Sequence, residues 1–143
     1  MAERTEDQMG PINVALRAED SDGAVSMVDN IVPAGTKGPF LHEHDFDEAF
    51  YVLEGELVFQ VRDELITARA GDLVFAPRRV PHTFTNRSGA PARFVIVFTP
   101  AGFERYFARM AAERAGVEPP AWALAPLPEV RRVGPRIGED AGS

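Results

Sequence analysis

The sequence predicts an all-β domain, a sandwich or barrel of short strands, followed by one α-helix and an extended tail. Three observations predict it. Between residues 12 and 99, eight or nine short strand-like runs alternate with Gly- and Pro-containing turns at regular spacing. A helical period of apolar residues occurs only afterwards, in residues 102–116. The rest, 117–143, is rich in Pro and Gly with isolated apolar anchors such as Trp122, which predicts a tail lying over the domain or a partner subunit.

The strand region follows a polar stretch, residues 1–11, that predicts a flexible N-terminal arm. The last run, 92–99, has bulky apolar residues on both faces, so both faces should be covered, as in a sandwich or an oligomer. The expected division is an arm at 1–11, a β-barrel at 12–100, and a helix with a Pro-rich tail at 101–143. The strands are expected at 12–18, 24–32, 40–53 with a polar DFD interruption, 56–62, 65–68, 73–76, 82–86 and 92–99.

Composition restricts the function. A net charge of −7 argues against a nucleic-acid partner and against an anionic membrane surface. With no cysteine in the chain, a metal would have to be bound by His, Asp or Glu. The first ten residues contain no apolar leader segment, and no apolar run is long enough to span a membrane, so we expect a cytoplasmic protein.

Two of the chain's three histidines stand two residues apart, at His42 and His44. In a strand, side chains two apart point to the same face, so both imidazoles could reach one ion. Glu48 has the same parity and joins them if the DFD segment preserves the register, whereas Asp45 and Asp47 have the opposite parity. The alternative is that such histidines are ordinary surface or core residues.

The longer pattern around these residues resembles the cupin family. Its first motif, G-x5-H-x-H-x3,4-E-x6-G, matches HEHDFDEAFYVLEG through His42, His44, Glu48 and Gly55. Its second motif, G-x5-P-x-G-x2-H-x3-N, matches GDLVFAPRRVPHTFTN through Gly71, Pro77, His82 and Asn86. Thr36 and Arg79 replace motif glycines, which puts the local turn geometry in doubt but leaves every ligand position intact.

The resemblance implies a single-domain cupin jelly-roll β-barrel or sandwich with a C-terminal α-helix. It also implies one divalent transition metal ion (Fe, Ni, Mn, Co, Cu or Zn) bound by His42, His44, Glu48 and His82, with coordination positions left for water or substrate. Glu48 would double as a general base. By parity, Phe50, Val52 and Phe84 are expected to line an apolar substrate pocket, and the alternative is that they are simply core.

The resemblance leaves the reaction open. The likeness to quercetinase-type dioxygenases, which includes the helix PAGFERYF after the last strand, favours O2-dependent oxidation of an enolisable aromatic, polyketide- or flavonol-like compound. The alternatives are a non-oxidative metal-dependent cyclase, isomerase or decarboxylase, and a non-catalytic module that binds a small ligand. The expected partners are a small-molecule substrate, O2 under the oxygenase alternative, and a second copy of the chain in a homodimer.

Overall fold

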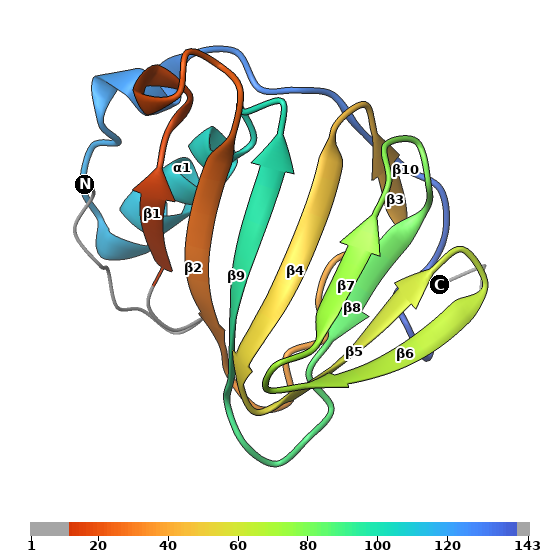
Figure 1. Ribbon diagram of the computed structural model, residues 1–143. Coiled ribbons are helices and arrows are strands. Elements are labelled where there is room, and N and C mark those ends of the chain that lie inside the picture. The colour runs from red at the N-terminus through yellow and green to blue at the C-terminus, as the bar shows by residue number, and fades with distance from the viewer. Residues whose placement is uncertain (1–11, 140–143) are drawn as a thin grey trace.

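Two antiparallel sheets of five strands each face one another in the computed structural model, which describes residues 12–139 (Figure 1). The arm expected at 1–11 lies outside the described residues. Sheet A has the order β1-β2-β9-β4-β7 and sheet B the order β10-β3-β8-β5-β6. The strands of sheet A are Ile12–Leu16, Ser26–Val32, Ala92–Thr99, Asp47–Glu54 and Leu73–Ala76, in that spatial order. Those of sheet B are Val130–Arg132, His42–His44, His82–Thr85, Glu56–Val61 and Glu64–Arg69.

The core lies between the sheets, and the period of two in the sequence determines which residues enter it. In β9 the residues Ala92, Phe94, Ile96 and Phe98 are buried, while those between them are only half-buried. Phe94, Ile96 and Phe98 each lie opposite inward residues of both β2 and β4 in the antiparallel register, and Ala92 lies opposite Val32 of β2. The predicted all-β sandwich with a C-terminal helix is therefore confirmed, as a jelly roll of two sheets.

The DFD interruption is the place where the chain changes sheets. Strand β3 ends at His44 in sheet B, residues 45–46 bend, and β4 begins at Asp47 in sheet A. Phe46 is buried at the bend, and its ring stacks on the His44 ring with 3.6 Å between centroids. The single strand expected over 40–53 is therefore two strands in opposite sheets.

The helix α1, Glu104–Ala115, agrees with the expected range and packs on β1 and β2. Its buried residues Phe107, Ala108 and Ala111 join the hydrophobic core. It ends at Gly116, whose left-handed backbone (φ 70°) lets its N–H bond back to the last turn. Within residues 12–139, no helix combines the length and apolar character needed to cross a membrane.

The tail after the helix folds back over the domain and adds a strand. A short 3₁₀ turn, Ala121–Leu124, places the half-buried Trp122 against the core. Arg109 of α1 holds this turn by donating to the carbonyl oxygens of Ala123 and Ala125, both at 2.6 Å. Strand β10 then pairs antiparallel with β3, at the edge of sheet B. The tail is thereby part of the sheet that carries three of the four predicted metal ligands, His42, His44 and His82.

Candidate metal centre

Four side chains converge between the sheets, and they come from both. His42 and His44 lie on β3, His82 lies on the neighbouring β8 directly opposite His42, and Glu48 faces them from β4 in sheet A. Each residue offers one ligand atom, and these atoms all lie within 4.8 Å of one another. The structure thus brings together all four predicted ligands, although Glu48 reaches them across the sandwich and not along the same strand. Below, these four residues are called the floor.

The donor atoms of three floor residues are close enough to share one ion. His44 Nε2 lies 2.9 Å from Glu48 Oε1 and 3.1 Å from His82 Nε2, and His82 Nε2 lies 3.2 Å from Glu48 Oε1. Donors at right angles around a transition metal, each at about 2.1 Å, are separated by about 3.0 Å, against about 3.4 Å in a regular tetrahedron. The observed separations fit one ion and are nearer to the right-angled arrangement.

Backbone carbonyls fix which nitrogen of each imidazole carries its hydrogen. The Nδ1 atoms of His42, His44 and His82 lie 2.7, 2.9 and 2.8 Å from the carbonyl oxygens of Phe40, Phe46 and Val80. Because a carbonyl only accepts, each Nδ1 donates, and in the neutral ring Nε2 is left with a bare lone pair. The lone pairs of His44 and His82 then face each other, an arrangement that a cation between them would stabilise.

The charges of the floor agree with this arrangement. Burial and, to a smaller extent, the neighbouring His82 lower the pKa of His42 to about 4, so this ring is neutral at neutral pH. Burial acts to raise the pKa of Glu48, but hydrogen bonds from His44 and His82, which can donate from Nε2 only when their rings are protonated, outweigh it and hold the pKa at about 2. Burial acts to lower the pKa of His82, and its hydrogen bond with Glu48 outweighs this effect and raises it. The floor therefore offers one ionised carboxylate and an attraction for positive charge.

A cavity of about 1000 Å³ opens above the floor. Of the three predicted pocket residues, Phe50 and Phe84 line it. Val52 points inward as expected but is completely buried in the core, two residues farther along β4, and is not among the lining residues. Helix α1 and the residue before it contribute Phe103, Tyr106, Phe107 and Met110 to the cavity wall, so much of the lining is aromatic.

The comparisons with known proteins concern the family and the fold of the chain. The family model for the cupin domain matches residues 28–98, about half of the chain, and includes all four floor residues. The chain belongs to the cupin superfamily.

An uncharacterized protein of Methanocaldococcus jannaschii (MJ1618) is 30% identical to this cupin over 76 residues, which cover 52% of the chain and 60% of that relative. TT1209 from Thermus thermophilus, a solved structure, is 30% identical with a TM-score of 0.51, covering 55% of the chain and 74% of that protein. The polyketide cyclase RemF from Streptomyces resistomycificus is 19% identical with a TM-score of 0.60, covering 92% of the chain and 76% of that protein. These likenesses concern the fold.

The two departures from the cupin motifs do not disturb the floor. Arg79 adopts the left-handed backbone (φ 64°) that the motif glycine would favour, and its N–H donates to the His44 carbonyl at 2.7 Å. Its exposed side chain pairs with Asp45 at 3.0 Å. Near Thr36, Gly38 has φ 76°, and a Cβ there would overlap the Phe84 carbonyl oxygen. The turn geometry is thus retained with an arginine in one glycine position.

Asn86, the last residue of the second motif, has a structural role. Its fully buried side-chain amide donates to the carbonyl oxygens of Val32, Pro33 and Ala90 and accepts from Ser88. It joins the end of β8 to the loop that follows β2. The motif alone does not show whether Asn86 is structural or a metal ligand. Its hydrogen bonds to backbone carbonyls show the structural role.

The lining of the cavity also contains four cations, here called the rim, that the sequence pattern did not identify. Arg132 and Arg136 come from the tail, Arg114 from the end of α1, and Lys37 from the loop before β3, near Phe40 in the chain. The sequence contains one indication of the rim, since three arginines stand close together in the tail at positions 131, 132 and 136. That signal is weak, because a charged tail is usually a solvated surface.

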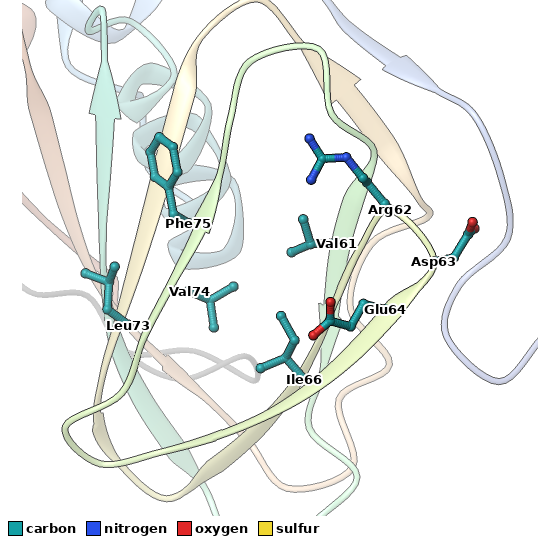
Figure 2. A pocket seen from close by; sticks show the side chains of 8 residues that line it. All are labelled: Val61, Arg62, Asp63, Glu64, Ile66, Leu73, Val74 and Phe75. Carbon is teal, nitrogen blue, oxygen red and sulfur yellow. The ribbon is translucent and has the colours of Figure 1, made fainter.

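A second, smaller cavity of about 520 Å³ lies between β7 and the hairpin of β5 and β6 (Figure 2). Figure 2 shows Val61, Ile66 and Val74 lying around the gap, with Arg62, Asp63 and Glu64 on the hairpin. None of its lining residues is a histidine, and none belongs to the floor. Among the described residues, this cavity therefore has no cluster of potential metal ligands, and we do not treat it as a candidate active site.

Proposed function

We propose that this cupin is a metal-dependent oxygenase that oxidises a small, enolisable aromatic or polyketide-like compound with O2. The observation that carries the proposal is the convergence of three Nε2 lone pairs and one carboxylate at the bottom of a large aromatic cavity. A divalent transition metal bound there would supply Lewis acidity toward substrate oxygens and the capacity to react with O2. The nearly right-angled donor spacing favours Fe, Mn, Co or Ni over tetrahedral Zn.

The chain's own residues would position the substrate and move its proton. Glu48 is the only carboxylate among the described residues that line the cavity, and with a pKa of about 2 it is ionised at neutral pH. As the carboxylate of this lining it is the candidate for accepting the proton of an enol or phenol, and it becomes a stronger base when the histidine hydrogen bonds that lower its pKa are released. Phe50 and Phe84 would hold a planar ring and exclude water from the reacting atoms.

Elemental analysis of the native protein, followed by O2-uptake measurements with a flavonol such as quercetin, tests this proposal. We expect roughly one redox-active metal per chain and O2 consumption that stops in the variant His42→Ala. Stoichiometric zinc with unchanged product formation under anaerobic conditions would show that the oxygenase proposal is wrong. A variant Glu48→Asp that retained metal but lost turnover would support the role of Glu48 as base.

A second candidate is a non-oxidative polyketide cyclase. It is supported by the likeness to RemF, which extends over 92% of the chain. Under this candidate, product forms without O2, and the same floor residues are required. Anaerobic turnover therefore separates the two candidates directly.

We also propose that the protein is a homodimer that uses the outer face of sheet A. Tyr51 on β4 lies opposite Leu73 on β7, Phe75 follows two residues later, and the three are 43%, 60% and 50% exposed. Large apolar side chains gathered on one sheet face are typical of an interface. Light scattering after size-exclusion chromatography should give a dimer mass, and Leu73→Lys should reduce it to that of a monomer.

A further inference from the structure

The rim of the cavity is positively charged although the protein is acidic. The chain has a net charge of −7, yet four cations line this cavity beside one carboxylate, Glu48, among the described residues. That carboxylate lies on the floor and is hydrogen-bonded to two histidines. Within residues 12–139, neither Lys37 nor Arg114 forms an ion pair, whereas Arg136 Nη1 lies 3.7 Å from the Glu139 carboxylate, which does not line the cavity. The charge of the rim is therefore opposite to that of the molecule.

Phe40 organises two of these cations. The guanidinium carbon of Arg132 lies 3.5 Å from the centroid of the Phe40 ring, and that of Arg136 lies 3.7 Å from it. Two guanidinium groups so close to one ring must lie on opposite faces, because on the same face they would overlap. Stacking uses the flat face of a guanidinium and leaves its N–H groups directed outward at the edge. Arg136 is positioned further because its Nε donates to the Gly38 carbonyl at 3.0 Å.

Strand register explains why Arg132 faces the cavity. In the antiparallel pair of β10 and β3, Arg132 lies opposite His42, so the two side chains lie on the same face of sheet B. Arg131 lies opposite Glu43 and points to the other face, where it pairs with Glu43 and Asp45. The chain thus places one arginine beside the metal ligands and its neighbour outside the cavity.

We propose that the rim is a carboxylate-binding subsite, in which Arg132 and Arg136 bind a carboxylate of a planar aromatic substrate. The carboxylate would accept the edge N–H groups of the two guanidiniums, and the ring would extend along the aromatic wall toward the floor. This inference rests on the proposed function and specifies its substrate class as aromatic acids. The cavity of about 1000 Å³ is large enough for several fused rings.

Two matched fluorescent probes test the subsite: 1-hydroxy-2-naphthoate, which carries a carboxylate, and neutral 1-naphthol. Binding is measured by fluorescence titration on chelator-treated, metal-free protein, so that neither catalysis nor direct binding of the carboxylate to a metal contributes. Charge-assisted hydrogen bonds should make the naphthoate bind at least about ten-fold more tightly than the naphthol. Equal dissociation constants for the two probes on the wild-type protein would overturn the proposal without any variant.

The double variant R132Q/R136Q should weaken naphthoate binding by roughly ten-fold or more and leave naphthol binding within about two-fold. Arg131→Gln, on the same strand but outside the cavity, is the matched control and should change neither constant. Equal weakening of both probes in R132Q/R136Q would indicate a general loss of the cavity and would also overturn the proposal. If the double variant fails to fold, judged by circular dichroism, the probe comparison on the wild-type protein decides.

These outcomes are independent of those for the proposed function. Carboxylate-selective binding without any turnover of an aromatic acid by the metal-loaded protein would leave the subsite standing and refute the enzyme proposal. If the metal-loaded protein turned over neutral substrates as fast as acidic ones, and the two probes bound with equal affinity, the enzyme proposal would stand and the carboxylate subsite would be refuted.

Discussion

The floor and the rim of the cavity are built in different ways. The floor residues His44, Glu48 and His82 are buried, and every imidazole is held at Nδ1 by a backbone carbonyl. The rim residues are exposed or half-buried and come from a loop, a helix end and the tail. Phe40 joins the two regions, since its carbonyl binds His42 and its ring seats Arg132 and Arg136.

Under the proposed function, this difference would separate the residues that perform the chemistry from those that select the substrate. Donor atoms must be placed within a few tenths of an ångström to share an ion, and paired strands inside a packed core provide that accuracy. A rim that attracts a charged group tolerates more variation in position, because Coulomb attraction changes slowly with distance. Substitutions in the floor should therefore abolish metal binding, whereas substitutions in the rim should change affinity and leave the metal in place.

The largest effect is expected for His44→Ala. Its Nε2 is the donor nearest to both Glu48 and His82, and its ring is completely buried against Phe46. We expect the metal content, measured by mass spectrometry of the purified protein, to fall to background. Glu43→Gln, one position earlier on β3 and not part of the metal cluster, is the control and should retain the wild-type content. Full metal occupancy in His44→Ala would mean that the ion binds elsewhere.

The next effect concerns stability, and Asn86→Ala should disturb both regions together. Removal of the amide leaves the buried carbonyl of Val32 and the partly buried carbonyls of Pro33 and Ala90 without this donor, and should cost about 3 kcal/mol of unfolding free energy. Urea denaturation measures it. Asn86→Asp retains the acceptor for Ser88 but loses the donors, so it should be nearly as unstable. A loss below about 1 kcal/mol in both variants would show that water replaces these bonds.

Parity and motif spacing predicted the four floor residues, but they did not predict that these residues come from two different sheets. The repeated period of two identified the strands and the inward face of β4, and the cupin motifs selected His42, His44, Glu48 and His82. The sheet change at residues 45–46 was not predictable, because a bend carried by Asp and Phe lacks Gly or Pro. Val52 shows a second limit: parity determines the face of a strand, but not the depth along it.

The rim could not be predicted from the sequence, because tertiary contacts alone bring its residues together. Strand β10 is three residues long, VRR, and has no alternation that would distinguish it from a loop. It is a strand because β3 offers it a free edge. Arg132 faces the cavity through that register, which depends on a pairing between segments about ninety residues apart.

A smaller effect, confined to the rim, is expected for Arg109→Ala. This side chain bonds the carbonyls of Ala123 and Ala125 and so ties the tail to α1. Its loss should cost about 1–2 kcal/mol and increase hydrogen exchange in the tail, residues 121–135, while metal content is unchanged. Glu113→Ala, exposed on the same helix, is the control. Loss of metal in Arg109→Ala would show that floor and rim are not separable in this way.

The smallest effect tests whether the turn beside the floor prefers glycine. Arg79 has φ 64°, where a side chain costs roughly 1 kcal/mol and glycine does not. Its ion pair with Asp45 is 70% and 63% exposed at the two side chains and contributes little. Arg79→Gly should therefore be more stable than Arg79→Ala by about 1 kcal/mol and lie within about 1 kcal/mol of the wild type.

Both Arg79 variants retain the backbone N–H that donates to the His44 carbonyl, so both should bind metal at the wild-type level. Urea denaturation of the two variants side by side measures the difference in stability, and mass spectrometry measures the metal. If Arg79→Ala were the more stable of the two, the left-handed backbone would not be the conformation of this turn in solution. The arginine would then be held by its side chain, and the accuracy of the floor would depend on an exposed residue after all.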